Sequence, residues 1–418
     1  MLSRRCFVLG GHTSPFIGAR HPSFIHKKHP DYGTVSNPTL EDYINTAVTG
    51  ALSSTSVPAS LVDRIFVGNF CGELFSSQGH LGAAAVGAHP DLAFKPSLRV
   101  EGACASGGLA LSSAVDAIQA NTADVVLVVG AEVQTTVSAR EGASYLARAS
   151  HYSRQRDIDE FTFPALFARR IKACVEAGTI TPEDLAILSH KAYANANRNP
   201  LAHMHAQKMS LDDARTSPNF LTNEALAPHI RLSDCSQVSD GGAALILASE
   251  YGMEVLEKRP SDVIELKGLG VATGSLYEDG ADLTHLQTTR HAANRAFEHM
   301  GFQFTASEIG VAEVHDCFTV TEALMAEAVG FCDKGKGGRM VREGELEIGG
   351  KFPTNTGGGL VGFGHPVGAT GVKQVLEVYR QMKGMCGEYQ VPGRPAFGVA
   401  ANMGGDDKTA VVSILMNH

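Results

Sequence analysis

The chain has 418 residues, 44% hydrophobic content and a formal net charge of −9. This length allows a large core in about two or three folding units, and the acidic balance argues against a basic nucleic-acid-binding stripe. No apolar run approaches the roughly 18 residues of a membrane-spanning helix, so we expect no membrane span.

The N-terminal segment Met1–Arg5 is basic, and the first acidic residue is Asp31. This composition favours a mitochondrial address. The stretch Arg5–His12 loosely resembles an N-terminal peroxisomal address, so a peroxisome-type organelle is the alternative, and the C-terminus carries no Ser-Lys-Leu signal.

Apolar segments and helical periodicity alternate along the chain. The first part predicts strand Cys6–Leu9, helix Thr39–Leu52, strand Ile65–Val67, helix Leu109–Ala120, strand Val125–Val129 and strand Ala243–Leu247. The second part repeats this order with strand Val263–Leu266, helix Thr288–Met300, strand Ile309–Val314, helix Val372–Met382, strand Phe397–Ala400 and strand Ala410–Leu415. The pattern predicts two related halves of an α/β fold, with helices on both faces of the sheets.

The interval 134–237 has no counterpart in the second half. It is rich in Arg, His, Asn and Tyr, and Pro182–Ala194 has helical periodicity. Because one structureless loop of this length is improbable, we predict an inserted domain at 134–237. It would separate residues 1–133 from 238–262 within the N-terminal half, and 263–418 would form the C-terminal half.

Cys104 lies in the small-residue turn Gly102–Gly108, at the entrance of a predicted helix. Nearby backbone N–H groups and the positive helix end would favour its thiolate and lower its pKa. The motif alone is equally compatible with a nucleophile and with a packing residue.

Eight cysteines are scattered without a CxxC pair or a zinc-type spacing. We therefore expect free thiols in a reduced intracellular protein, with no metal.

The glycine-rich segment Asn355–Gly371 contains Gly364-His365-Pro366. It lacks the Lys-Ser/Thr ending of a phosphate-binding P-loop. A lone His before Pro is more often structural, but the surrounding glycines favour close approach of a substrate. Pro366 suits the first position of a helix, and a neutral His365 at that helix entrance would donate a hydrogen bond to a developing oxyanion.

Two further loops follow predicted strands. His315 and Cys317 lie two residues apart at a strand end and face similar directions, an arrangement that is ordinarily a satisfied buried pair. The segment Ala401–Asp407 has Gly404 and Gly405 suited to present a backbone N–H, although alone it is typical of a turn.

All four loops lie at strand ends in corresponding parts of the two halves. We therefore predict that two cysteines and two histidines converge on one site, namely Cys104, Cys317, His315 and His365.

These motifs resemble those of the thiolase family over essentially the whole chain. Gly102–Gly107 resembles the thiolase nucleophile loop, Asn355–Gly371 closely resembles the Gly-His-Pro signature, and Ser239–Ala244 is similar to the Asn-Asp-Gly-Ala-Ala segment. Most thiolases have Asn-Glu-Ala-Phe in place of His315–Phe318 and Cys-x-Gly in place of Asn402–Gly404.

Both departures are similar to the sterol-carrier-protein type of thiolase. The resemblance implies that Cys317 takes over the acid/base task of the missing C-terminal cysteine. The animal fusion form adds a lipid-transfer domain, which we do not expect here because this chain ends with the thiolase-like segment.

The resemblance also implies a thiolase fold, with a duplicated five-layered α/β/α/β/α core and an inserted loop domain. It implies a homodimer with no cofactor, which binds CoA as a substrate beside the loop domain and not as a tightly held prosthetic group. The expected reaction is reversible, CoA-dependent cleavage of 3-oxoacyl-CoA to acetyl-CoA and a shortened acyl-CoA.

In that reaction Cys104 would carry the acyl group and Cys317 would move a proton at C2. His365, with His315 or a water it holds, would form an oxyanion hole for the enolate. Backbone N–H groups of Cys104 and Gly404 would form a second hole.

Two alternatives remain open from the sequence. Another condensing enzyme of the same fold would use a Cys-His-Asn or Cys-His-Glu set, against which the Gly364–Pro366 segment argues. A low-turnover acyl-CoA-binding protein is the other alternative, because Asn402 stands where most thiolases have their second catalytic cysteine.

Overall fold

The computed structural model describes residues 2–280 and 282–418. The strands are β1 (Cys6–Thr13), β2 (Arg64–Gly68), β3 (Ser97–Val100), β4 (Val125–Glu132), β5 (Gly241–Ser249), β6 (Ile264–Thr273), β7 (Ile309–Val314), β8 (Phe397–Gly404) and β9 (Thr409–Asn417). The helices outside the insertion are α1 (Leu40–Thr55), α2 (Gly72–Phe75), α3 (Leu81–Val86), α4 (Ser106–Gln119), α10 (Glu250–Val255), α11 (Gln287–Glu298), α12 (Thr319–Ala328), α13 (Gly337–Arg342), α14 (Gly359–Phe363) and α15 (Val367–Lys383).

The strands form one mixed sheet in the order β3-β2-β4-β5-β1-β6-β9-β8-β7. Its two halves join where Cys6–Val8 of β1 pairs antiparallel with Ile264–Leu266 of β6. Outward from this junction, β1-β5-β4-β2 corresponds to β6-β9-β8-β7, and β3 extends the first half alone. The duplication predicted from the sequence is therefore confirmed.

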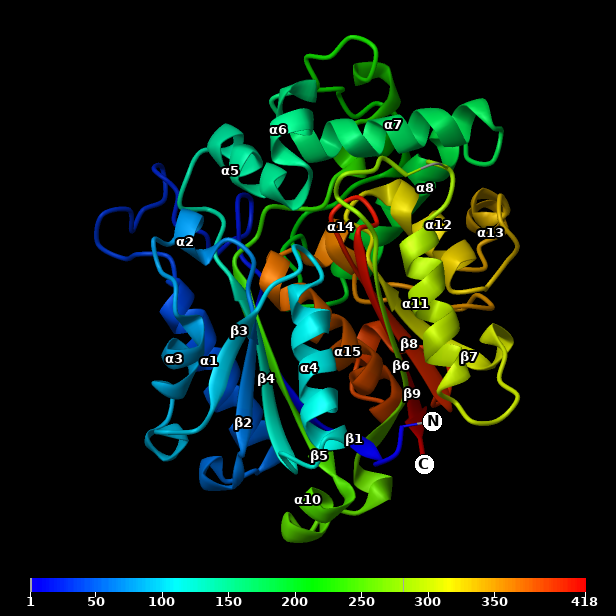
Figure 1. The fold of residues 1–418 in the computed structure, drawn as a ribbon. Helices are drawn as coiled ribbons and strands as arrows, with labels where there is room; N and C mark the ends of the chain where they lie inside the picture. Colours follow the sequence, from blue (N-terminus) through cyan, green and yellow to red (C-terminus); the bar gives the residue numbers. More distant parts are fainter. Residues whose placement is uncertain (1, 281) are drawn as a thin grey trace.

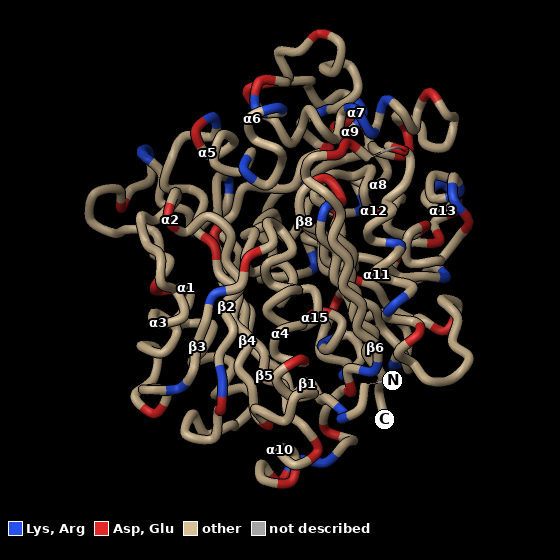
Figure 2. Tube along the Cα trace, viewed as in Figure 1, with Lys and Arg blue, Asp and Glu red and all other residues tan. Residues whose placement is uncertain are grey.

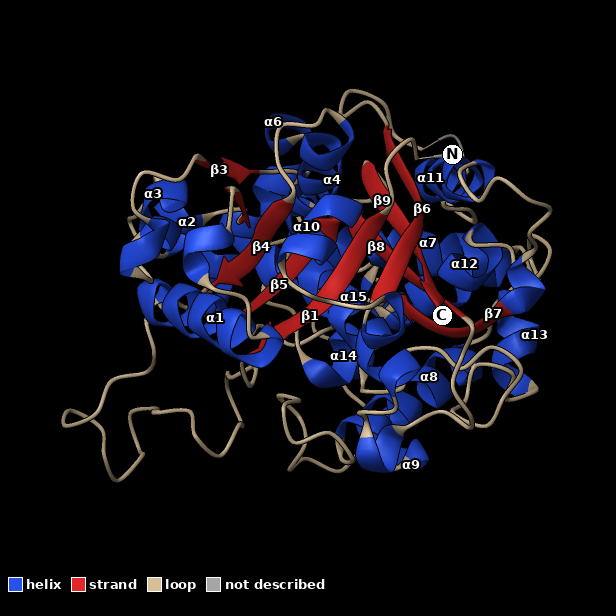
Figure 3. Cartoon of the chain, turned by 90° about the horizontal axis from the view of Figure 1, so that it is seen from below, coloured by secondary structure: helices blue, strands red, loops and turns tan. Residues whose placement is uncertain are grey.

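Helices separate and cover the two halves of the sheet. Helices α4 and α15 contact each other and strands of both halves, so they form the middle layer (Figures 1 and 3). Helices α1 and α3 cover the outer face of the first half, and α11 covers that of the second (Figure 1). This is the predicted five-layered α/β/α/β/α arrangement.

Strand β4 explains why the apolar strands show no clean alternation. Val126 and Val128 belong to the core that faces α4 and α15, whereas Leu127 and Val129 belong to the core that faces α1. Both faces of the strand are buried, so both sets of side chains must be apolar. In Figure 2, charged residues lie mainly on the outer helices and loops, and strands β4 and β5 carry almost none. This is expected of strands that are buried on both faces.

The first strand of each half is longer than the sequence predicted. We expected β1 to end at Leu9 and β6 at Leu266, but both continue through glycines. Each strand shifts register once, between Val8 and Gly10 and between Leu266 and Gly268. These are β-bulges at corresponding positions, and Gly10 takes a φ of +125° that favours glycine.

The segment between β4 and β5 is helical in the described residues. It contains α5 (Ala139–Leu146), α6 (Tyr152–Gln155), α7 (Thr162–Glu176), α8 (Pro182–Ala196) and α9 (Leu211–Arg215), and it lies across the top of the sheet in Figure 1. Phe167 of α7 stacks on Phe318 with ring centroids 4.4 Å apart. The segment thus shares a core with the second half. Its domain boundaries remain a prediction.

None of the helices in residues 2–280 and 282–418 combines the length and apolar character that crossing a membrane requires.

Candidate active site

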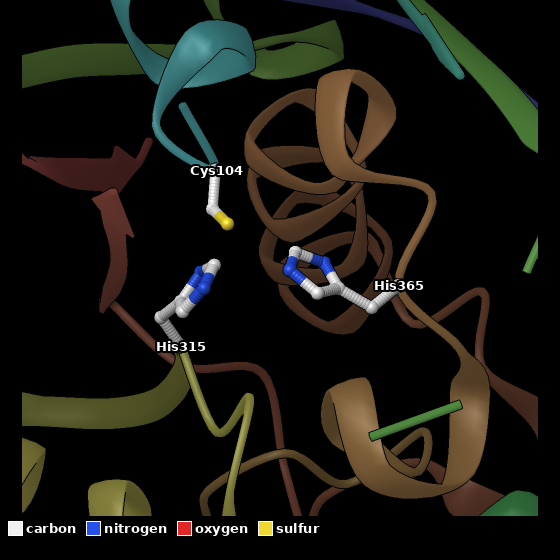
Figure 4. Close-up of side chains that lie close together, drawn as sticks. All are labelled: Cys104, His315 and His365. Atoms are coloured by element: carbon white, nitrogen blue, oxygen red, sulfur yellow. The ribbon is translucent and has the colours of Figure 1, made fainter. Parts of the chain in front are cut away.

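Cys104 lies in a tight turn directly before α4. The preceding residue, Ala103, has a left-handed φ of 54°, an uncommon conformation for a residue with a side chain. The hydroxyl of Ser106 braces this turn, since it accepts from the N–H of Gly102 at 3.1 Å and donates to the carbonyl of Ala103 at 2.6 Å. The turn directs the half-buried Cys104 side chain into the site (Figure 4).

His365 precedes α15, as its Gly-His-Pro motif predicted. Its Nδ1 lies 2.6 Å from Oγ1 of Thr370, and that hydroxyl donates to the carbonyl of Pro366 at 3.1 Å. A hydroxyl has one hydrogen, so both contacts form together only when Nδ1 carries the ring proton. The buried Nε2 has no partner in the structure and is then an acceptor that faces the site. The prediction that a neutral His365 donates a hydrogen bond into the site is therefore wrong for this tautomer, because Thr370 holds the ring proton on Nδ1.

His315 follows β7 and has the opposite tautomer. The Asn402 amide nitrogen donates to Nδ1 of His315 at 3.1 Å and to the carbonyl of Cys104 at 3.1 Å. The orientation of this amide is fixed because its oxygen accepts from the N–H of Gly108 at 3.1 Å. Nδ1 of His315 is therefore an acceptor, and the proton of the neutral ring lies on Nε2.

The three side chains meet in one place, as Figure 4 shows. One ligand-type atom from each of Cys104, His315 and His365 lies within 4.8 Å of the others. The two rings are nearly perpendicular, with centroids 5.0 Å apart. The triad could in principle hold a metal ion, but Asn402 leaves His315 with a proton on Nε2, which suits a hydrogen-bond donor better than a ligand.

Burial decides the protonation of all three groups. It raises the pKa of Cys104 to about 12, even though the backbone N–H groups of Gly405 and Cys104 itself act to lower it. The sequence-based expectation of a lowered pKa is therefore wrong, because desolvation of the Cys104 thiol outweighs the backbone N–H groups of the turn. Burial lowers the pKa of His365 to about 3 and that of His315 well below its usual value, so both rings are neutral near pH 7.

Cys317 lines the same cavity as Cys104 and His365. Its side chain is 7% exposed and lies just before the N-terminus of α12. Burial raises its pKa well above the usual value, and the nearby Cys104 sulfur adds to this shift, whereas a hydrogen bond with Thr321 opposes it. Cys317 is therefore a neutral thiol within the site, placed as the sequence predicted.

The loop after Met403 contributes Gly405 to the cavity wall. Gly405 directs its N–H to the Cys104 sulfur. The neighbouring Gly404 is buried against the nucleophile turn, where a Cβ atom would lie 2.2 Å from the carbonyl oxygen of Gly102. The Gly405 N–H thus lies at the Cys104 sulfur, and the role of the Gly404 N–H in the second oxyanion hole stays a prediction.

Comparisons with known proteins fit this geometry. The chain matches the family model described as "Thiolase, N-terminal domain" at residues 27–251 and the model described as "Thiolase C-terminal domain-like" at residues 271–417. The chain belongs to the thiolase family.

Among thiolase relatives, an acetyl-CoA acetyltransferase from Methanothermobacter thermautotrophicus is 34% identical over 94% of this chain and 99% of its own length. Sterol carrier protein 2 from Bos taurus is 30% identical over 86% of this chain, which covers 65% of that protein.

Solved structures show the same thiolase fold. The structure titled "Ltp2-ChsH2(DUF35) aldolase" matches with a TM-score of 0.78 at 19% identity, over 100% of this chain and 99% of that one. Human mitochondrial 3-ketoacyl-CoA thiolase in complex with CoA matches with a TM-score of 0.71 at 17% identity, over the same shares.

Two buried side chains that hold the loops of this thiolase site in place were not predicted from the sequence. The buried Glu132 carboxylate accepts from backbone N–H groups of Phe70 at 2.8 Å and Gly368 at 3.1 Å, so it joins the end of β4 to the start of α15. The Gln134 amide donates to the carbonyl of His365 at 2.8 Å. Both residues follow an apolar run, and nothing local in the sequence shows what lies opposite them.

Proposed function

We propose that this thiolase cleaves 3-oxoacyl-CoA with CoA, through an acyl group carried on Cys104. The observation that supports this most strongly is the convergence of Cys104, His315 and His365 within 4.8 Å, at a cavity that also holds the Cys317 thiol. Thiolysis needs a nucleophile, a base for it, an oxyanion donor and a second proton carrier, and the site has one candidate for each role.

The first half-reaction begins with the neutral Cys104 thiol. His365 accepts its proton at the unpartnered Nε2 while the sulfur bonds to C3 of the substrate. The tetrahedral intermediate collapses, the C2–C3 bond breaks, and the products are acyl-Cys104 and the enolate of acetyl-CoA. The backbone N–H groups of Cys104 and Gly405 are suited to stabilise the oxygen on C3, because they already point at the sulfur.

The two histidines would then stabilise the enolate oxygen. His315 is a donor at Nε2 because Asn402 occupies its other nitrogen. His365 becomes a donor at Nε2 once it has accepted the proton of Cys104. Losing one such donor typically costs about 3–4 kcal/mol of transition-state stabilisation.

Cys317 completes the proton balance. Its thiol protonates C2 of the enolate, which releases acetyl-CoA and leaves a thiolate. That thiolate takes the proton of an incoming CoA thiol, and CoA attacks acyl-Cys104. The shortened acyl-CoA leaves, and the Cys104 thiolate recovers its proton from His365. Condensation is the reverse of these steps, and CoA is a substrate throughout.

The His315–Phe318 loop and Asn402 also support assignment to the sterol-carrier-protein type of thiolase.

We further propose a homodimer. Strand β3 lies at an edge of the sheet, Leu98 on it is 46% exposed, and Phe94 just before it is fully exposed. An edge strand presents unpaired backbone groups to a second copy, and the exposed Leu98 and Phe94 side chains add apolar area to such a contact. Light scattering that finds a fully active monomer would contradict the dimer.

A thiolysis assay tests the proposed reaction. Purified protein is incubated with 3-oxoacyl-CoA and CoA, and mass spectrometry identifies acetyl-CoA and the shortened acyl-CoA. Cys104→Ala should abolish product, whereas Cys332→Ala, which removes a thiol that does not line this cavity, should not. Tight acyl-CoA binding without products would favour the low-turnover binding protein instead.

A further inference from the structure

Arg170 is a buried cation that the proposed reaction does not use. It lies on α7, within the segment between β4 and β5, and its side chain is 2% exposed. Its guanidinium forms an ion pair with Asp406 through Nε, and Nη1 donates to the backbone carbonyls of Leu283 at 3.0 Å and His285 at 3.1 Å. A buried charge is costly unless it is paired and hydrogen-bonded, so these three acceptors hold the guanidinium in one place.

Asp406 lies directly after the glycine whose N–H reaches the nucleophile. Gly405 donates this N–H to the Cys104 sulfur. The glycine has a left-handed φ of 65°, and a Cβ atom there would lie 2.8 Å from the carbonyl oxygen of Ala149. Glycine has the widest conformational freedom of any residue, so the direction of its N–H depends on contacts that hold the turn around it.

Asp407 holds the other side of the same turn. Its carboxylate accepts from the backbone N–H groups of Thr288 at 2.8 Å and Thr289 at 3.0 Å, at the start of α11. That contact joins the turn to the second half of the molecule, whereas the contact between Asp406 and Arg170 joins it to the segment between β4 and β5. The two consecutive carboxylates therefore hold the Gly405 turn from two sides.

We infer that Arg170 is a positioning residue, which through Asp406 holds the Gly405 N–H at the Cys104 sulfur. The inference rests on the proposed function, because this N–H acts when an oxyanion forms on the carbon bonded to that sulfur. An arginine suits the role, since its planar guanidinium presents donors in fixed directions to three acceptors at once. A lysine would offer one flexible point charge instead.

The effect on Cys104 has a sign that separates positioning from packing. An N–H directed at the sulfur stabilises the thiolate, so displacement of Gly405 makes the thiol harder to ionise. A side chain that serves only packing would, when removed, loosen the cover of the cavity and expose Cys104 to reagents. Positioning by Arg170 thus predicts slower alkylation of Cys104 in the variant, whereas packing predicts faster alkylation.

Two rates measured on Arg170→Met test the inference. Iodoacetamide alkylation of Cys104 at pH 8, located by mass spectrometry, should fall by about tenfold, the effect of one pKa unit on the thiolate fraction. Acylation of Cys104 by acetyl-CoA should fall by about 10²-fold, the usual cost of displacing a catalytic group by about 1 Å. Unchanged or faster alkylation in the folded variant would overturn the inference.

Arg169→Met is the matched control. Arg169 precedes Arg170 on α7 and lies 3.5 Å from Asp279, so this variant removes an ion pair from the same helix without removing a contact of Asp406. Both rates should stay at their wild-type values. A loss equal to that of Arg170→Met would overturn the inference, since it would show that any weakening of α7 is sufficient.

Asp406 provides a second test, which holds even where Arg170→Met does not fold. Asp406→Asn keeps an oxygen that accepts from the guanidinium, whereas Asp406→Leu keeps none. The leucine variant should lose both rates by the factors given above, and the asparagine variant should lose far less. Equal rates in the two variants would overturn the inference.

The alkylation rates need no CoA substrate. A wild type that does not cleave 3-oxoacyl-CoA would refute the proposed reaction, and the alkylation rates would still decide the role of Arg170.

Discussion

Asn402 donates a hydrogen bond from its side-chain nitrogen to Nδ1 of His315, at 3.1 Å. The same amide contacts Cys104 and Gly108, so the nucleophile turn, helix α4 and the His315 loop all fix its orientation. The residue that replaces the second cysteine of most thiolases thus gives His315 a defined tautomer. Within the site, His315 is therefore a hydrogen-bond donor at Nε2, whereas His365 is an acceptor at Nε2.

Asn402→Asp should reverse this tautomer. The carboxylate would accept from Nδ1–H of His315, leave Nε2 without a proton and raise the pKa of the ring. We expect kcat to fall by about 10²-fold or more near pH 8, because a wrong tautomer removes a catalytic hydrogen bond. As the pH falls through the raised pKa, the imidazolium regains a proton on Nε2, so the activity of the variant relative to wild type should rise. A ratio that does not change with pH would mean that Asn402 acts only in packing.

Cys104 should behave as a protonated thiol in the resting protein. Its pKa of about 12 means that the thiolate fraction, and hence the rate of iodoacetamide alkylation, rises by about tenfold per pH unit between pH 7 and 10. A plateau near pH 9 would contradict the raised pKa.

Incubation with acetyl-CoA should acetylate Cys104, and mass spectrometry should locate the acetyl group there. Modification mainly at another cysteine would refute the nucleophile assignment.

The sequence predicted those features that depend on local pattern. Strand β7 begins and ends where its apolar run does, at Ile309 and Val314. Strands β1 and β6 were predicted too short, because the glycines that look like loop residues are bulge and packing positions. At Gly270, for instance, a Cβ atom would lie 1.9 Å from the carbonyl oxygen of Ala292.

Long-range contacts could not be predicted in the same way. The four loops of the candidate site could be grouped because the duplication brings corresponding strand ends together. The contact between Asn402 and His315 spans 87 residues, and the desolvation of Cys104 depends on everything that surrounds it. Neither property leaves a local signal in the sequence.

A buried ion pair beneath the site should stabilise the fold. Lys373 of α15 lies 2.8 Å from Glu313 of β7, and both side chains are 1% exposed. Lys373→Met leaves an unpaired buried carboxyl and should lower the free energy of unfolding by about 3–5 kcal/mol. Replacing both residues, in Lys373→Met/Glu313→Leu, should recover much of that loss.

The pH dependence of that loss has a definite sign. Burial raises the pKa of Glu313 to about 7 even with Lys373 present. A carboxyl whose folded pKa is raised costs stability as the pH rises from the unfolded pKa through the folded one. Removing Lys373 raises the pKa of Glu313 further, so below about pH 7 the carboxyl is protonated in both folded proteins and the deficit of Lys373→Met should stay nearly constant. Above about pH 7 the wild type ionises Glu313 beside Lys373 while the variant resists ionisation, so the deficit should grow there. Denaturant titrations at several pH values would measure it, and a constant deficit would contradict the assignment.

His365→Ala should lower kcat by about 10²–10³-fold while the fold is retained. The variant loses both the base for Cys104 and a donor for the enolate, whereas the substrate still has its apolar cavity. Circular dichroism and the thermal midpoint serve as the folding control. A well-folded variant with near wild-type turnover would show that the unpartnered Nε2 has no part in the reaction.

Cys317→Ala should separate acyl transfer from proton transfer. Acylation of Cys104 by acetyl-CoA needs no proton at C2, so mass spectrometry should still detect acyl-Cys104. Thiolysis and condensation should fall by about 10²–10⁴-fold, the usual range for a general acid–base group. Deuterium exchange at C2 of acetyl-CoA should fall in parallel, because Asn402 offers no group that titrates near neutral pH.

The chain offers a matched control for this experiment in Cys235. It lines the same cavity, and its backbone pairs with Phe318 next to Cys317, but it has no place in the proposed proton path. Cys317→Ala should therefore lose exchange and thiolysis, while Cys235→Ala loses far less of either. If both variants kept wild-type exchange, Cys317 would be a packing residue and the proton at C2 would need another carrier, such as His315.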